Sequence, residues 1–256
     1  MSTIRWTVTF QVYRQKGDEA PHYQDFKLEV DPDEYVLDGV ERIWAFHDRT
    51  LCFRHACHHS TCGACGMRVN GVEKLTCITT IRSITHDGGV IRMDPLRNFV
   101  IVSDLAVDMG SMYRNNQRVG QRSVNLDRLE AIEPELRPAA VMTPPEEGVE
   151  YVRLSDCIEC GLCISACPIS ASSEDYLGPA VLAAAHQNGL QGNTQVLPLV
   201  DSEDGLWRCH AAYECSAVCP SFVDPGWRIM DLRKQVIAER VRRFFRGETR
   251  PAAEVK

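Results

Sequence analysis

A run of closely spaced cysteines constrains this chain more than any other feature of its sequence. The run has the form C-x2-C-x2-C-x3-C-P and consists of Cys157, Cys160, Cys163, Cys167 and Pro168. In such a run the first three thiolates bind one iron–sulfur cluster and the fourth points toward a different cluster. The run therefore predicts two clusters, and the second cluster needs ligands from elsewhere in the chain.

A second cysteine group later in the chain supplies these ligands. It comprises Cys209, Cys215 and Cys219, followed by Pro220. Aligned with the first run, it has Ala212 where the second cysteine would stand, and a methyl group cannot bind iron. A zinc ribbon would account for paired C-x2-C motifs, but it would not need two C-x3-C-P endings.

The two groups together predict two different clusters. One is a 4Fe–4S cluster with four thiolates, and the other has three thiolates, which suit a 3Fe–4S cluster. The alternative for the second is a 4Fe–4S cluster with a non-cysteine ligand such as water. The expected ligands are Cys157, Cys160, Cys163 and Cys219 for the first cluster, and Cys167, Cys209 and Cys215 for the second.

A third cysteine constellation lies in the first half of the chain. Its spacing is C-x4-C-x2-C-x11-C, which begins with the plant-type signature of a 2Fe–2S cluster and ends with a remote fourth ligand. Gly63 and Gly66 beside the ligands allow the backbone to approach the cluster closely. The expected ligands are Cys57, Cys62, Cys65 and Cys77.

Two other interpretations of this region are weaker. Cys57 and His59 form the first half of a Rieske site, but no C-x-x-H follows. Counting from Cys52 shifts the register and loses the C-x2-C continuation, so Cys52 is expected to be a small buried apolar residue. His55, His58 and His59 either donate hydrogen bonds near the cluster or are ordinary surface residues.

Composition narrows the class of protein. The 256 residues contain twelve cysteines, whose grouping favours metal binding in a reducing compartment over disulfides. No apolar run approaches the length of a membrane span, and we see no export signal. The net charge of −7 argues against a nucleic-acid partner. The basic segment 228–256 is either a solvated helix face or lies near anionic lipid or a partner.

Local patterns predict an α+β chain. Residues 3–14 and 22–30 read as a strand hairpin, and residues 67–72 and 90–93 as further strands. Asp31-Pro32-Asp33-Glu34 resembles a helix start, with the helix running to about Asp48. A helical segment is expected from Val100 to about Asn115. After Pro220 apolar residues recur at helical spacing through Phe245, and a short helix is expected over residues 176–185.

These patterns predict two domains. The first is a β-grasp domain of the plant-type 2Fe–2S ferredoxin kind over residues 1–120, in which strands surround a helix. Residues 121–150, rich in proline and glutamate, are expected to be a linker. An all-α domain of the bacterial ferredoxin kind should follow over residues 151–246, with residues 247–256 as a tail.

In this arrangement the chain resembles the iron–sulfur subunits of succinate dehydrogenase and fumarate reductase, over nearly its whole length. The shared stretches include Cys62-Gly63-Ala64-Cys65-Gly66-Met67, Asn70-Gly71, Cys77-Ile78-Thr79, 104–109 (DLAVDM) and Leu177-Gly178-Pro179-Ala180. There are two departures. His58-His59-Ser60 replace the family's Arg-Glu-Gly, and Ala171 and Ser172 stand where ubiquinone-linked members carry a tryptophan pair.

The resemblance implies an electron-transfer subunit that is inactive alone. Electrons would pass from FAD in a flavoprotein subunit, through the three clusters, to a quinone beside membrane-anchor subunits, while succinate is oxidised to fumarate. The family places a quinone pocket near Pro168 and His210, and the missing tryptophan pair favours a menaquinone-type partner. The chain is then peripheral on the cytoplasmic face of a bacterial inner membrane. The alternatives are fumarate reduction in reverse, a subunit of a soluble thiol:fumarate reductase, and a soluble ferredoxin-like carrier.

Overall fold

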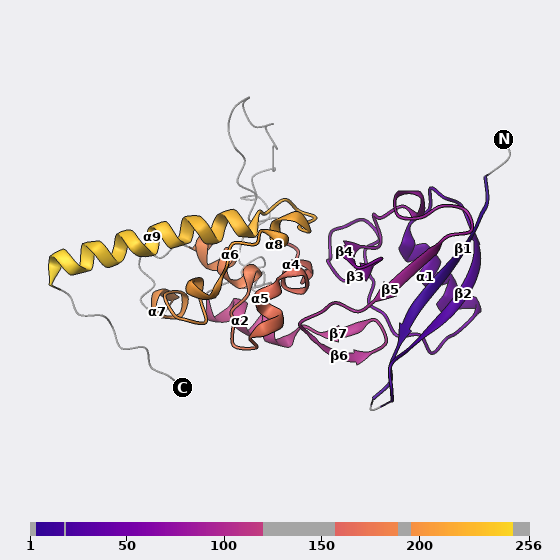
Figure 1. Ribbon diagram of the computed structural model, residues 1–256, viewed down its shortest axis with the longest axis horizontal. Coiled ribbons are helices and arrows are strands. Elements are labelled where there is room, and N and C mark those ends of the chain that lie inside the picture. Colours follow the sequence, from indigo (N-terminus) through magenta and orange to yellow (C-terminus); the bar gives the residue numbers. More distant parts are fainter. Residues whose placement is uncertain (1–3, 18, 120–156, 189–195, 248–256) are drawn as a thin grey trace, which may run out of the picture.

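The computed structural model describes residues 4–17, 19–119, 157–188 and 196–247. Strands gather in the N-terminal part and helices in the C-terminal part, and the two parts lie side by side along the long axis of the molecule (Figure 1). The expected division into a strand-rich first half and a helical second half is confirmed within these residues. The predicted linker 121–150 lies outside the described residues, as does nearly all of the predicted tail.

A mixed sheet forms the framework of the N-terminal part. Its strand order is β2-β1-β5-β3-β4. The central pair β1 and β5 runs parallel, while β1–β2, β3–β4 and β3–β5 are antiparallel. The strands are β1 (Trp6–Arg14), β2 (His22–Val30), β3 (Gly66–Val69), β4 (Val72–Leu75) and β5 (Val90–Asp94).

Helix α1 (Val36–Phe46) packs on this sheet. Alternate residues of β1, among them Phe10, are fully buried, and Val40 and Ile43 of α1 join the same apolar core. The helix begins later than predicted, because Asp31 accepts the backbone N–H of Asp33 in a turn instead of capping a helix. The first-turn carboxylate is that of Asp38, which accepts the Tyr35 N–H at 2.9 Å.

The prediction of one helical segment from Val100 to Asn115 is wrong in its first half. That half is a two-stranded ribbon of β6 (Val100–Ser103) and β7 (Ala106–Asp108), and only α2 (Gly110–Arg118) is helical. The β-branched run Val100-Ile101-Val102 explains the difference, since such side chains fit strands better than helices. In Figure 1, α2 lies among the helices of the C-terminal part.

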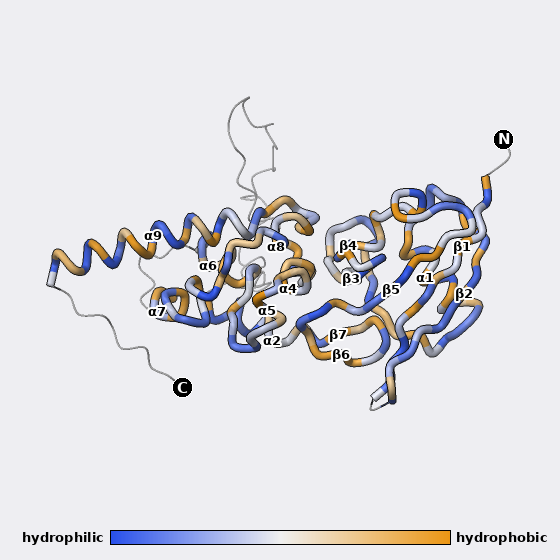
Figure 2. The backbone as a smooth tube through the Cα atoms, viewed as in Figure 1, coloured by the Kyte–Doolittle hydropathy of each residue, from blue (hydrophilic) through white to orange (hydrophobic). Residues whose placement is uncertain are grey.

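In its described residues, the C-terminal part consists mainly of helices. The longest of these is α9, along which hydrophobic and hydrophilic residues recur in turn (Figure 2). Asp224 caps this helix by accepting the Trp227 N–H at 3.1 Å, and the helix ends at Gly247 in the left-handed conformation. Short 3₁₀ turns occur at Ile81–Ser83 (η1) and Leu206–Arg208 (η3). The helices are α4 (Leu162–Ala166), α5 (Pro168–Ser172), α6 (Pro179–Asn188), α7 (Val196–Val200), α8 (Glu214–Ala217) and α9 (Pro225–Arg246).

Two apolar clusters hold the helical part and join it to the sheet. One lies between α6 and α9 and contains Leu182, Ile229 and Leu232. The other contains Leu75 from the sheet and Leu162 from α4, so it crosses the boundary between the two parts. Because the second cluster also contains Cys65 and Cys160, the cysteine loops of both parts are seated in one core.

Candidate metal centres

The first cysteine constellation forms a loop at the end of the sheet that faces the helices. The loop follows α1 and closes on β3, while the remote Cys77 follows β4. Cys65 and Cys77 are buried, whereas Cys62 is exposed. His58 and Ser60 have left-handed backbone conformations, with φ of 61° and 58°. These conformations turn successive backbone N–H groups toward the thiols.

Backbone N–H groups of the loop donate to its sulfur atoms. Sγ of Cys57 accepts from His59 at 3.5 Å and from Thr61 and Cys62 at 3.3 Å each. Sγ of Cys77 accepts from Ser60 at 3.4 Å. Amide donors stabilise negatively charged sulfur, so this loop has the chemistry that a thiolate-bound cluster needs.

The thiol pKa values reflect these surroundings. The N–H groups of His59 and Cys62 lower the pKa of Cys57 to about 6. Burial, followed by the neighbouring thiol of Cys65, raises the pKa of Cys77 to about 12. A coordinating metal deprotonates a thiol outright, so a buried thiol such as Cys77 remains suited to hold iron.

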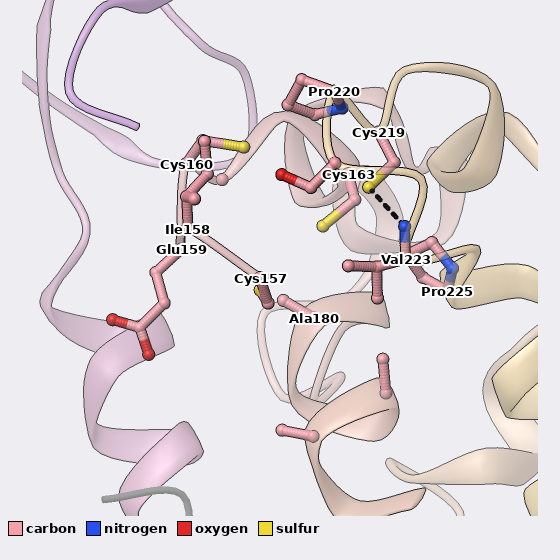
Figure 3. A pocket seen from close by; sticks show the side chains of 14 residues that line it. Cys157, Ile158, Glu159, Cys160, Cys163, Ala180, Cys219, Pro220, Val223 and Pro225 are labelled. Atoms are coloured by element: carbon pink, nitrogen blue, oxygen red, sulfur yellow. Dashed lines mark hydrogen bonds between the residues drawn. The ribbon is translucent and has the colours of Figure 1, made fainter. Parts of the chain in front are cut away.

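The second centre is a pocket between α4, α6 and the start of α9. Figure 3 shows the sulfur atoms of its cysteines facing a common space, with Ala180 and Val223 on the wall. The Val223 N–H donates to Sγ of Cys219 at 3.4 Å. Burial raises the pKa of Cys160 to about 12 and that of Cys163 well above its ordinary value. The cysteines of this pocket are Cys157, Cys160, Cys163 and Cys219.

The third centre is a smaller pocket near α5 and α8. Three thiols line it, and Ala212 lines the same pocket at the position where the first run has a cysteine. The Ala211 N–H donates to Sγ of Cys209 at 3.4 Å, and burial raises the pKa of Cys215 to about 11. Three thiols without a fourth fit a cluster that lacks one corner. The cysteines of this pocket are Cys167, Cys209 and Cys215.

The two helical pockets hold different cysteines. Cys167 of the first run lines the third centre, and Cys219 of the second group lines the second centre. Cys52 lines none of these pockets and is half-buried. Its backbone N–H donates to the buried Asp104 carboxylate at 2.9 Å.

The predicted quinone residues lie at the third centre. Pro168 and His210 both line its pocket, and both are exposed. Although these two residues are far apart in the sequence, both lie at the pocket that the three thiols line.

A polar cluster that the sequence analysis missed ties the sheet to α4. The Ser165 hydroxyl donates to the buried Glu73 at 2.8 Å and accepts the Arg97 N–H at 2.9 Å. The Asn98 side chain donates to the Ile164 carbonyl at 2.7 Å. Since α4 lies between Cys160 and Cys167, this cluster fixes how the second and third centres sit against the sheet. Partners this far apart in sequence leave no local signal.

Comparison with known families agrees with this architecture. A family model described as a 2Fe-2S iron-sulfur cluster binding domain matches residues 9–114, and one described as a 4Fe-4S dicluster domain matches residues 153–223. The fumarate reductase iron-sulfur subunit of Mycobacterium tuberculosis is 34% identical over 221 residues, covering 85% of this chain and 87% of the relative. The chain belongs to the family of fumarate reductase and succinate dehydrogenase iron–sulfur subunits.

Other members of this family extend the match. The fumarate reductase iron-sulfur subunit of Wolinella succinogenes is 31% identical over 252 residues, covering 93% of this chain and 98% of the relative. A chain in the structure titled "Mycobacterium smegmatis Sdh1 complex in the apo form" has the same fold, with a TM-score of 0.73 and 23% identity, and the match covers 92% of this chain and 98% of that one. A member of this family is an electron-transfer subunit of an oxidoreductase, with the 2Fe–2S domain first and the helical 4Fe–4S domain second.

Within the described residues, no helix combines the length and the apolar character that crossing a bilayer requires.

Proposed function

We propose that this chain is the iron–sulfur subunit of a succinate dehydrogenase, in which it carries electrons from the FAD of a flavoprotein subunit to a membrane quinone. The observation that carries the proposal is that three thiol-lined centres lie one after another in space. The first loop lies against the second centre, and Cys167 and Cys219 connect the second centre to the third. Iron–sulfur clusters bound there supply one-electron chemistry.

We assign the ligands by centre. The N–H donors on Cys57 and Cys77 support the first set, and the converging thiols of the two helical pockets support the others. The 2Fe–2S ligands are Cys57, Cys62, Cys65 and Cys77; the 4Fe–4S ligands are Cys157, Cys160, Cys163 and Cys219; the 3Fe–4S ligands are Cys167, Cys209 and Cys215.

We also propose a β-grasp fold for the N-terminal domain. A mixed sheet that packs against α1, with a cysteine loop at one end, supports a β-grasp domain of the plant-type ferredoxin kind. We place that domain at residues 1–120, a linker at 121–150, the helical domain at 151–246 and a tail at 247–256.

The protein's own contribution to electron transfer is positional and electrostatic. Buried contacts around Ser165 fix the distance between sheet and helices, and apolar walls such as Ala180 and Val223 exclude water from the second centre. Backbone N–H groups at Cys57, Cys209 and Cys219 stabilise charge on sulfur and thereby set the reduction potentials.

Exposed apolar side chains support a partner near the third centre. Phe222 is 86% exposed and Tyr213 is 47% exposed, and both lie in the segments that carry Cys215 and Cys219. A freely diffusing ferredoxin-like carrier does not need such a surface. We infer that membrane-anchor subunits cover it, with the chain peripheral on the cytoplasmic face of a bacterial inner membrane.

The exit for electrons is assigned to Pro168 and His210. A neutral imidazole can donate to a quinone carbonyl or relay a proton near neutral pH. Because Ala171 and Ser172 replace the tryptophan pair of ubiquinone-linked relatives, we favour a menaquinone-type quinone.

The second candidate function is fumarate reduction, with electrons flowing in the opposite direction. It is favoured by the similarity of this chain to the fumarate reductase iron-sulfur subunits of Mycobacterium tuberculosis and Wolinella succinogenes. The same three centres serve either direction, so the distinction lies in their reduction potentials.

The test is purification of the intact complex from its native membrane through a tag on another subunit. We expect this chain to co-purify with a FAD-containing subunit and membrane anchors, and the complex to reduce a menaquinone analogue with succinate. Faster fumarate reduction by the quinol would select the second candidate. Recovery of the chain as a soluble monomer with all its iron would contradict both.

A further inference from the structure

Three side chains beside the first cysteine loop offer metal ligands that the clusters do not use. Glu41 lies on α1, and His55 and His58 lie in the loop that follows it. Their three ligand atoms all lie within 4.8 Å of one another. Oε1 of Glu41 is 2.8 Å from Nδ1 of His55 and 3.1 Å from Nε2 of His58. One carboxylate oxygen is thus in contact with both imidazoles.

Packing and backbone conformation hold the two imidazoles in place. The ring of Phe53 stacks on His55, with centroids 4.9 Å apart and planes 20° apart. His58 stands edge-on to His55 at 5.6 Å. His58 also has a φ of 61°, which is set by the loop that carries Cys57. The three ligand atoms are therefore positioned before any ion arrives.

The arginines closest to these residues in the sequence contact other groups. Arg42 binds the Glu29 carbonyl at 2.7 Å and pairs with Glu34. The Arg49 guanidinium lies 4.4 Å above the Trp44 ring, and Arg54 contacts the Met109 sulfur at 2.6 Å. These three arginines therefore contact groups other than the Glu41 carboxylate, whose Oε1 faces the two imidazoles.

We propose that Glu41, His55 and His58 bind a divalent transition-metal ion, with Zn²⁺ as the ion that their chemistry fits best. Imidazole nitrogen and carboxylate oxygen are standard Zn²⁺ ligands at about 2.0–2.2 Å, which places tetrahedral ligand atoms about 3.3 Å apart. The observed 2.8 and 3.1 Å need to widen by only a few tenths of an ångström. The imidazoles are 40% and 44% exposed, which leaves room for water as a fourth ligand.

The donor set separates this site from the cluster sites. Thiolates select iron–sulfur clusters, whereas two imidazoles and a carboxylate suit Zn²⁺, Ni²⁺ or Cu²⁺. The alternative without a metal is a carboxylate that simply accepts hydrogen bonds from two imidazoles. A zinc titration distinguishes these two possibilities, because only a metal site takes up one equivalent of zinc.

The experiment is a titration of ZnSO₄ into the full chain with its clusters in place, followed by calorimetry and by X-ray absorption at the zinc edge. We expect about one equivalent of zinc, with imidazole and oxygen scattering, no sulfur scattering and unchanged iron content. Glu41→Gln and His55→Ala should each weaken binding by at least about tenfold.

His59→Ala is the matched control, because His59 is an exposed histidine in the same loop that lies outside the group of three. We expect this variant to bind zinc like the unaltered chain. His58→Asn should weaken zinc binding as His55→Ala does, and asparagine tolerates the left-handed backbone, which leaves the loop able to fold. Absence of uptake, zinc bound by sulfur, or equal weakening by His59→Ala would overturn the proposal.

Discussion

Gly63 of the first cysteine loop lies against Ile158 of the second. A Cβ atom built on Gly63 would come within 2.5 Å of the Ile158 carbonyl oxygen and 3.0 Å of the Cys160 Cβ. No side chain fits between the two loops at this point. The cysteine loops of the first two centres therefore lie in close backbone contact.

Gly63→Ala should disturb this contact. Its φ of 69° costs an L-residue about 1–2 kcal/mol, and the backbone contact forces the loops apart in addition. We expect slower reduction of the second centre by succinate, measured by freeze-quench EPR of the complex, and a lower melting temperature.

Gly71→Ala is the control for backbone conformation alone. Gly71 has a φ of 85°, but nothing lies within 4 Å of a Cβ there. It should lower the melting temperature by about 2–8 °C, which corresponds to 1–2 kcal/mol, and leave electron transfer unchanged. Equal electron-transfer rates in the two variants would contradict a role for the loop contact.

Ala212→Cys should restore the missing thiolate of the third centre. Ala212 lines the pocket of Cys167, Cys209 and Cys215, so a thiol there completes a set of four. We expect conversion of the 3Fe–4S cluster to 4Fe–4S, a lower potential within the family range of roughly −700 to +450 mV, and impaired quinone reduction. Activity with a flavin-level acceptor should survive.

Ala217→Cys adds a thiol to the neighbouring α8 but outside that pocket, and it serves as the control. It should leave the 3Fe–4S signal of the oxidised protein intact. An unaltered 3Fe–4S spectrum in Ala212→Cys would count against the assignment of the third centre.

His210→Ala should lower quinone-linked turnover far more than succinate oxidation with a flavin-level acceptor. The reason is the exposed position of His210 at the mouth of the third centre. Loss of one positioned proton donor typically costs a factor of about 10²–10⁴. His86→Ala, which alters a loop of the N-terminal part, is the control. If both activities fall together, His210 has a structural role only.

Asp104→Asn should destabilise the N-terminal domain. The Asp104 side chain is fully buried, and it accepts from Arg14 Nε at 3.1 Å and from the Cys52 N–H at 2.9 Å. Asparagine tolerates the left-handed backbone of this position but removes the charge that pairs with buried Arg14. We expect a loss of about 3 kcal/mol, or roughly 6–12 °C in the melting temperature.

Asp33→Asn is the control, because it removes one charge of an ion pair at the surface. Asp33 pairs with Arg82, and both side chains are more than half exposed. This change should cost less than about 1 kcal/mol. A similar shift in both variants would show that burial of Asp104 contributes nothing beyond an ordinary ion pair.

Local sequence patterns predict the long helices and strands well. The alternation in β1 and β2 and the apolar spacing in α9 are strong because each repeats over many residues. The cysteine spacings are equally strong, because converging thiolates tolerate few chain lengths between them. Each of the two helical pockets is lined by one group of these cysteines, and their assignment as cluster ligands stays a prediction.

Contacts between distant segments could not be predicted in this way. The Ser165 hydroxyl meets Glu73 only because the two domains pack as they do, and Glu41 meets His55 only because the chain turns after α1. The ribbon of β6 and β7 was missed because three β-branched residues are too short a run to outweigh the neighbouring helical pattern. The contacts of Ser165 and Glu41 depend on tertiary packing, whereas the ribbon depends on the balance of two local patterns.

The most direct test of this account is an iron determination on the intact complex, combined with EPR of the air-oxidised protein. Clusters of two, four and three irons predict about nine iron atoms per chain and a 3Fe–4S signal from the third centre. About ten iron atoms, with no 3Fe–4S signal in intact protein, would contradict the assignment of a 3Fe–4S cluster to that centre.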